Sequence, residues 1–203
     1  MPHADAAYVP TGLSKPEFWS HVYDQLAALL DGQRTWVSNL ANASALIYNS
    51  LLAYPSHFGD GEHAVNWCGF YIESAYFPSP RLTSGNVAAG QGDSRHLLLG
   101  PFCGKPACQF INVTPGKARG VCADAFMHRQ TKLVADVDAY PGHIACDGET
   151  KSEIVCPLIV KHQAEETVVG VLDLDCLALG GFDSDDEVGL TRIAELLSRS
   201  CDW

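Results

Sequence analysis

Apolar side chains recur at helical spacing in several stretches of the chain. In residues 14–30 the recurring positions are Trp19, Val22, Leu26 and Leu29. Because this spacing places its members on one side of a helix, the pattern predicts a helix there, and similar patterns predict helices over residues 35–52 and 120–129. Ser184 and Glu187 have the spacing of a capping box, which predicts the first turn of a last helix.

Apolar runs without helical spacing lie between these stretches and predict strands. The runs cover residues 66–72, 96–102, 132–134, 154–160 and 167–175. Prolines and glycines predict an irregular segment over residues 103–119 and a long loop over residues 78–93. Because only a short polar turn separates the last two runs, we expect an α+β fold, with a largely antiparallel sheet of about six strands and helices packed on it.

Length and charge narrow the classes of function. The 203 residues fit a single domain, 1–203, in which residues 1–13 are expected to form a flexible N-terminal segment. The net charge is −11, so nucleic acid is not an expected partner, because phosphate binding needs a basic surface. The first ten residues lack a secretory signal and no apolar run reaches membrane length, so we expect no membrane partner and a cytoplasmic location.

The chain contains eight cysteines, namely Cys68, Cys103, Cys108, Cys122, Cys146, Cys156, Cys176 and Cys201. In a reducing compartment such thiols serve in catalysis, bind metal or are buried as small apolar side chains. No C-x-x-C pair and no cysteine–histidine cluster has the spacing of a zinc site, so no metal is expected. We expect simple burial for Cys68, Cys156, Cys176 and Cys201.

Two cysteines lie in sequence contexts that favour reactivity. Cys108 ends a glycine- and proline-rich turn in which the Lys105 ammonium would favour a thiolate. Cys122 follows Gly120 at the expected start of a helix, where the helix dipole lowers the pKa of a thiol. By this argument alone Cys122 is the best nucleophile. A third cysteine, Cys146, lies in a polar loop, residues 141–153, whose density of reactive groups fits either a functional loop or an ordinary charged surface.

Acidic and aromatic residues on the expected strands raise further alternatives. Asp173 and Asp175 are two residues apart on an apolar strand, so their side chains point to the same face. A solvated strand end explains the two carboxylates most simply, and the functional alternative is a cationic group of a ligand held between them. Trp67 and Tyr71 also share a face, which indicates core packing more strongly than the floor of a ligand pocket.

Taken together, these segments resemble the free methionine-(R)-sulfoxide reductases, a branch of the GAF-domain family. The matching stretches are Asn66-Trp67, Gly69-Phe70-Tyr71, Leu99-Gly100-Pro101-Phe102, Gly104-Lys105, Ala107-Cys108, Gly120-Val121-Cys122, Gly142-His143-Ile144-Ala145-Cys146-Asp147, Ser152-Glu153-Ile154-Val155 and Gly170-Val171-Leu172-Asp173-Leu174-Asp175. The resemblance runs from about Leu29 to the C-terminus. It implies a GAF-like domain, and general GAF domains lack both the three cysteines and the Gly-His-Ile-Ala-Cys-Asp stretch.

The resemblance implies an activity and its partners. The expected reaction is thiol-dependent reduction of free L-methionine (R)-S-oxide to L-methionine. It passes through a cysteine sulfenic acid and an intramolecular disulfide, which thioredoxin recycles. No metal or organic cofactor is required, and relatives imply a homodimer.

The resemblance also assigns roles to single residues. Cys146 takes the position of the nucleophile, Cys108 that of the resolving cysteine and Cys122 that of a third thiol; whether Cys108 or Cys122 is the main resolver stays open. The residues matched to substrate binding are Trp67, Tyr71, Glu153, Asp173 and Asp175. We prefer Cys146 to Cys122 as nucleophile because its loop also delivers Glu153, and the nucleophile must lie within reach of a proton donor.

The chain departs from the family pattern at two places. The spacing of 14 between Cys108 and Cys122 is longer than in the family, which bears on the role of Cys108. Cys103 stands where glutamine is common and is expected to add a thiol beside the site. Two other functions compete with reduction: a GAF sensory module that binds a ligand without converting it, and a hydrolase built on Cys146 and His143, for which no oxyanion-hole motif is evident.

Overall fold

The computed structural model describes residues 8–78, 95–144 and 147–203. Its centre is a six-stranded sheet in the order β3-β2-β1-β6-β5-β4, and every neighbouring pair is antiparallel. The strands are β1 (Val65–Glu73), β2 (His96–Gly104), β3 (Phe110–Asn112), β4 (Lys132–Val134), β5 (Ser152–His162) and β6 (Glu165–Cys176). The expected α+β class with an antiparallel sheet is therefore confirmed.

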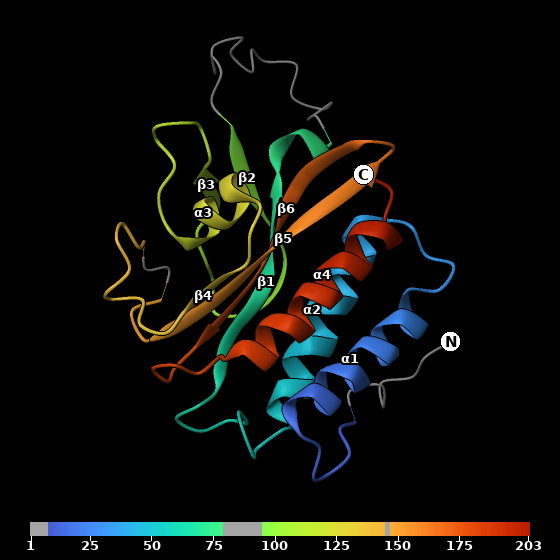
Figure 1. Cartoon of the computed structure of the whole chain (residues 1–203), viewed down its shortest axis with the longest axis vertical. Coiled ribbons are helices and arrows are strands. Elements are labelled where there is room, and N and C mark those ends of the chain that lie inside the picture. The colour runs from blue at the N-terminus through green and yellow to red at the C-terminus, as the bar shows by residue number, and fades with distance from the viewer. Residues whose placement is uncertain (1–7, 79–94, 145–146) are drawn as a thin grey trace.

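Helices cover both faces of this sheet (Figure 1). The long helices α1 (Lys15–Leu30), α2 (Trp36–Leu52) and α4 (Ser184–Ser200) pack together on one face and bury the larger apolar core there. The short helix α3 (Val121–His128) lies on the other face over a smaller core, and a 3-10 turn, η2 (Ser74–Tyr76), follows β1. The face that carries α3 includes the buried carboxyl groups of Glu153 and Asp173.

The apolar patterns located most elements within a few residues. In α1 the predicted stripe is buried at Trp19, Val22 and Leu26, and Leu30 rather than Leu29 completes it. One expectation was wrong: residues 103–119 include β3, a three-residue edge strand that pairs with β2 alone. Such a short strand leaves no periodic signal, because its pairing partner and not its own sequence fixes it.

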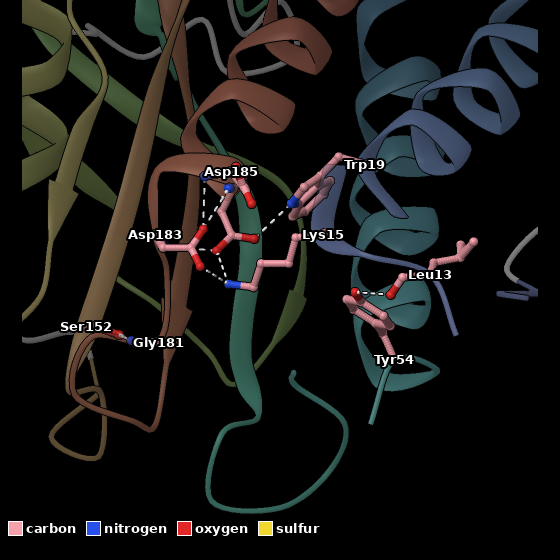
Figure 2. Close-up of polar contacts among 9 residues, drawn as sticks. Leu13, Lys15, Trp19, Tyr54, Ser152, Gly181, Asp183 and Asp185 are labelled. Carbon is pink, nitrogen blue, oxygen red and sulfur yellow. Dashed lines mark hydrogen bonds and ion pairs between the residues drawn. The ribbon is translucent and has the colours of Figure 1, made fainter. Parts of the chain in front are cut away.

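The start of α4 differs by one residue from the predicted capping box. The N-cap is Asp183, whose carboxylate accepts hydrogen bonds from the backbone N–H groups of Asp185 and Asp186, so the expected Ser184–Glu187 box is wrong. Figure 2 shows this cap beside Lys15 and Trp19 of α1. Lys15 Nζ lies 2.9 Å from Asp183 Oδ2, and Trp19 Nε1 donates to the buried carboxylate of Asp186 over 2.8 Å. These contacts join α1 to α4 on the sheet face that lies away from α3.

The ion pair at this junction illustrates two opposed electrostatic effects. Burial raises the pKa of Asp186, while the Lys15 ammonium and the Trp19 hydrogen bond lower it, and the net direction is upward. The attraction between Lys15 and Asp186 shown in Figure 2 is therefore offset by the cost of burying the carboxylate, and the ion pair adds little net free energy of folding.

The N-terminal segment and the long loop are covered only in part. Of residues 1–13, residues 8–13 are described, and they pack against the helices: Val9 is buried and the Tyr54 hydroxyl donates to the Leu13 carbonyl over 2.8 Å. Nearly all of the predicted 78–93 loop lies outside the described residues. Among the helices that are described, none is both long and apolar enough to cross a bilayer.

The cysteines expected to be buried are buried, but Cys103 is not where we expected it. Cys68, Cys156, Cys176 and Cys201 are all inaccessible or nearly so. Cys103 on β2 pairs with Cys68 on β1, and directly opposed residues share a sheet face. Because Cys68 belongs to the core under the long helices, Cys103 faces that core too and not the α3 side, which corrects the expected position of this thiol.

Candidate active site

A cavity of about 240 Å³ lies on the α3 side of the sheet. Its walls come from the sheet strands β1, β3, β5 and β6, from the first turn of α3, and from the loops that follow β2, β3 and β4. The volume is somewhat below the usual range for drug-sized ligands, which indicates a ligand about as large as an amino acid. Every described residue that the sequence marked as a site residue lines this cavity.

Strand register brings three carboxyl groups together at the bottom of the cavity. Asp173 and Asp175 alternate along β6, and Asp175 lies opposite Glu153 of β5. Asp173 is 6% exposed and Glu153 is 5% exposed, whereas Asp175 is half-buried. A solvated strand end is therefore the wrong interpretation of Asp173, and the shared face predicted for the two aspartates is confirmed by their place in one cavity wall.

Burial changes the protonation of this carboxyl cluster. Burial raises the pKa of Asp173 to about 7, although hydrogen bonds from Cys122 and Glu153 lower it. Burial and the neighbouring Asp173 raise the pKa of Glu153 well above its usual range, and the same two causes raise that of Asp175. Because carboxyl groups this close cannot all ionise, the cluster retains a proton near neutral pH, and the apparent pKa values belong to the cluster as a whole.

The thiol of Cys122 completes the cluster. Its Sγ lies 3.2 Å from Asp173 Oδ2 and 3.8 Å from Glu153 Oε1, so the S–H group donates toward the carboxyls. The helix α3 starts where the sequence predicted, at Val121. The expected low pKa of the thiol is nevertheless wrong, because burial and then Asp173 raise the pKa of Cys122 well above its ordinary value. A helix dipole lowers a thiol pKa only where no buried anion opposes it.

The thiol of Cys122 and two of the carboxyl groups are also close enough together to share a metal ion. Within the described ranges, Cys122, Glu153 and Asp173 form the one group of three or more acidic, histidine or cysteine residues whose donor atoms all lie within 4.8 Å of one another. Bound protons and a bound metal exclude each other on these atoms, since ligation requires the thiolate and carboxylate forms. The expectation that the protein needs no metal stays a prediction.

Aromatic side chains form the part of the wall next to the carboxyls, since Trp67 of β1 pairs with Asp175 of β6. Trp67 is stacked on Tyr71, with ring centroids 5.8 Å apart, and on Phe102, at 5.5 Å. Gly69 makes this arrangement possible, since a Cβ there would lie 2.6 Å from the Trp67 ring. Trp67 and Tyr71 are nearly inaccessible and also line the cavity, so both interpretations of them hold: they belong to the smaller core and present a face to the ligand space.

Two polar atoms in the cavity wall have no protein partner among the described residues. They are Nε1 of Trp67 and Oδ1 of Asp173, and both are buried. An unsatisfied buried polar group costs about 1–3 kcal/mol, so such atoms in a cavity mark positions where a ligand or water supplies the missing hydrogen bond. Trp67 Nε1 is a donor, and the Asp173 carboxyl can donate when it is protonated. A ligand with an oxygen that accepts hydrogen bonds would suit both.

Of the two remaining predicted residues, one is described, and it lies at the entrance. Cys108 is half-exposed and lines the cavity, and its backbone carbonyl accepts a hydrogen bond from the Tyr71 hydroxyl at 3.0 Å. Lys105 does not serve the Cys108 thiol as expected, because it forms ion pairs with Asp147 and Glu149. Cys146, the predicted nucleophile, lies outside the described residues.

Residues next to Cys146 in sequence are fixed beside the carboxyl cluster. Nε2 of His143 lies 3.7 Å from Glu153 Oε2, and burial lowers the pKa of His143, so the ring is neutral near pH 7. Asp147 lines the cavity, and its carboxylate accepts a hydrogen bond from Asn66 Nδ2 at 3.2 Å. The sequence reasoning missed Asn66 as an anchor of this loop, although it stands within the matched Asn66-Trp67 stretch.

Comparison with known proteins places this arrangement in a class. The chain is similar over its full length to a solved structure described as a GAF domain, with 38% identity, a TM-score of 0.77 and coverage of 100% of this chain and 98% of the other. It is similar to a free methionine-R-sulfoxide reductase from Neisseria meningitidis, solved in complex with its substrate, with 29% identity, a TM-score of 0.70 and coverage of 94% and 92%. The fold is thus that of a GAF domain, and no protein-family model matches the chain.

Curated relatives narrow the class further. The chain is 41% identical over 199 residues to the free methionine-R-sulfoxide reductase of Saccharomyces cerevisiae, covering 98% of this chain and 94% of the relative. It is 35% identical over 187 residues to the enzyme of the same name from Escherichia coli, covering 92% and 90%. The chain therefore belongs to the family of free methionine-R-sulfoxide reductases, which are oxidoreductases, and the family predicted from the sequence motifs is confirmed.

Proposed function

We propose that this protein reduces free L-methionine (R)-S-oxide to L-methionine in the cavity beside α3. The observation that carries the proposal is the meeting of a proton-retaining carboxyl cluster with an aromatic wall around an amino-acid-sized space. Family membership supports the same substrate, since the relatives are named for it. The R preference comes from the relatives' names and not from any contact in the cavity.

The aromatic side chains suit the apolar groups on the sulfoxide sulfur, and the acidic side chains suit the sulfoxide oxygen. The apolar face of Trp67 fits the methyl group and methylene chain of the substrate. Glu153 and Asp173 lie on the neighbouring strands β5 and β6 of the same wall, where a protonated carboxyl would donate a hydrogen bond to the sulfoxide oxygen. This placement would satisfy Oδ1 of Asp173, which has no partner among the described residues.

The proposed chemistry begins with attack of the Cys146 thiolate on the sulfoxide sulfur. Oxygen leaves only if it is protonated, and the Glu153–Asp173 pair holds a proton where the oxygen would lie. The protonated oxygen then moves as a hydroxyl from the substrate sulfur to the Cys146 sulfur. The transient bond between the two sulfurs breaks with its electron pair on the substrate, so methionine is released and Cys146 is left as a sulfenic acid. Either Cys108, at the entrance, or Cys122, beside the carboxyls, then condenses with it to give a disulfide and water.

The disulfide is recycled by an external dithiol in this proposal. Thioredoxin is the expected reductant, because thiol–disulfide exchange needs an accessible disulfide and an attacking thiolate. The half-exposed position of Cys108 supports its role as the sulfur that the reductant reaches, whereas Cys122 is buried. The proposed setting is the cytoplasm, where thioredoxin is kept reduced, and the homodimer implied by relatives stays a prediction.

The test is an assay with each sulfoxide epimer separately, with dithiothreitol or thioredoxin as reductant. Catalytic release of methionine from the R epimer, with the S epimer at least about tenfold slower, supports the proposal. Release from neither epimer would favour the sensory-module alternative, provided that the R epimer still binds in a calorimetric titration. Acylation of Cys146 by a peptide-like probe would revive the hydrolase alternative.

A further inference from the structure

Two cations at the entrance of the cavity have no partner among the described residues. Lys117 and Arg119 both line the cavity and both are exposed. Among the side chains that the structure describes, neither forms a hydrogen bond or an ion pair, whereas Lys105 is held by Asp147 and Glu149. The chain has a net charge of −11, so two cationic side chains without an ion pair among the described residues make this part of the surface positive in an acidic protein.

The segment that carries these cations is held in a defined turn. The backbone N–H groups of Lys117 and Ala118 both donate to the Thr114 carbonyl, over 2.9 and 3.0 Å, and Thr114 N–H donates to Asn112 Oδ1 over 2.8 Å. Ala118, between the two cations, packs against the apolar core under α3. The turn therefore presents Lys117 and Arg119 at the cavity while its middle residue anchors it to the domain.

The cavity consequently has opposite electrostatic character at its two ends. Its inner end holds Glu153, Asp173 and Asp175, and its exposed end holds Lys117 and Arg119, while the remaining lining carboxylate, Asp147, is paired with Lys105. A free amino acid carries one group that suits this entrance and that a residue inside a peptide lacks, namely an ionised α-carboxylate. The guanidinium of arginine matches a carboxylate with two parallel hydrogen bonds, which makes Arg119 the better recognition group of the two.

We propose that Arg119, assisted by Lys117, binds the α-carboxylate of the substrate and so selects free methionine sulfoxide over methionine sulfoxide within a peptide chain. This inference rests on the proposed function, because it assigns a specificity role within the same cavity. With the sulfoxide oxygen at Glu153 and the methyl group on Trp67, the α-carbon end of the substrate points to the entrance. A peptide bond in place of the carboxylate leaves the cations unpaired and adds chain that the entrance must accommodate.

The test compares free methionine-(R)-sulfoxide with its α-carboxamide, which lacks the negative charge but retains every other group. In the wild-type protein the carboxamide should have the higher KM. Arg119→Gln should raise the KM of the free acid roughly 10- to 100-fold and leave the KM of the carboxamide and both kcat values within about threefold. Lys117→Gln should act in the same direction with a smaller effect, and the double variant should remove the discrimination between acid and carboxamide.

A matched control is Lys161→Gln, which removes one positive charge at the end of β5 that is remote from Glu153. It should change neither KM, so a general effect of net charge is separated from carboxylate binding. If the double variant discriminates between acid and carboxamide as well as the wild type does, the inference is overturned. If the wild type releases no methionine from the free R epimer, the proposed function itself fails, and the two failures are thus distinguishable.

Discussion

Replacing Cys146 by serine should lower methionine release by about 10,000-fold or more, because the hydroxyl that replaces the thiol is a far weaker nucleophile toward sulfur. The prediction rests on the matched Gly-His-Ile-Ala-Cys-Asp stretch and on its neighbours, since His143 contacts Glu153 and Asp147 lines the cavity. The measurement is the amount of methionine formed per protein molecule when the reduced protein meets excess R epimer without any external reductant. Wild type should form about one equivalent of methionine, and Cys146→Ser none.

The other two cysteines should behave differently in the same experiment. Cys108→Ser or Cys122→Ser should retain a single equivalent of methionine release, while turnover with thioredoxin collapses in the variant that lacks the main resolving thiol. Cys103→Ser is a matched control, because Cys103 faces the core on the other side of the sheet. If Cys122→Ser and not Cys146→Ser abolishes the first equivalent, the nucleophile is Cys122 and the proposed assignment is wrong.

Glu153→Gln should lower kcat by roughly 100- to 10,000-fold while changing KM little, because it removes a proton donor and keeps the shape of the side chain. Burial and the neighbouring Asp173 raise the pKa of Glu153, so its carboxyl keeps a proton to donate near neutral pH. The amide still hydrogen-bonds a sulfoxide oxygen, so binding survives while departure of the oxygen becomes slow.

Asp173→Asn decides which carboxyl delivers the proton. If Glu153 is the donor, the loss of kcat in Asp173→Asn is smaller than in Glu153→Gln, because Asp173 then acts on the pKa of its neighbour. If Asp173 is the donor, the order of the two losses is reversed. Near-wild-type kcat in both variants, measured at saturating R epimer, would show that neither carboxyl supplies the proton.

Sequence reasoning found the parts of the site that depend on alternation and on contiguous motifs. Alternation along β6 placed Asp173 and Asp175 on one face, and the matched stretches brought Glu153, Trp67 and Tyr71 to the same cavity. These inferences succeed because side-chain direction in a strand is fixed by the backbone and does not depend on distant residues. The predictions of the long helices were correct for the same reason, since the helical spacing of their apolar residues can be recognised within each segment alone.

The features that could not be predicted from the sequence depend on contacts between segments that are distant in the chain. The pKa of Cys122 is raised first by burial and then by Asp173 and Glu153, which lie far from it in the chain, so the local helix-dipole argument gave the wrong direction. The buried state of Asp173 depends on the strands beside it, and β3 exists only because β2 pairs with it. Cys103 was misplaced because the register between β1 and β2 is set by the whole sheet.

The most direct test of the account is the pH dependence of the first equivalent of methionine release, measured in rapid mixing without external reductant. Attack by a thiolate alone would make the rate rise with pH until the thiol is ionised. A proton held by the carboxyl cluster adds the opposite dependence: the acid is present below the cluster's pKa and is lost as pH rises through it. With the pKa of Asp173 raised to about 7, the rate should fall above about pH 7, and Asp173→Asn should move this fall to lower pH, because Glu153 loses the neighbour that raises its pKa. A rate that increases steadily through this range, alike in wild type and Asp173→Asn, would contradict the account.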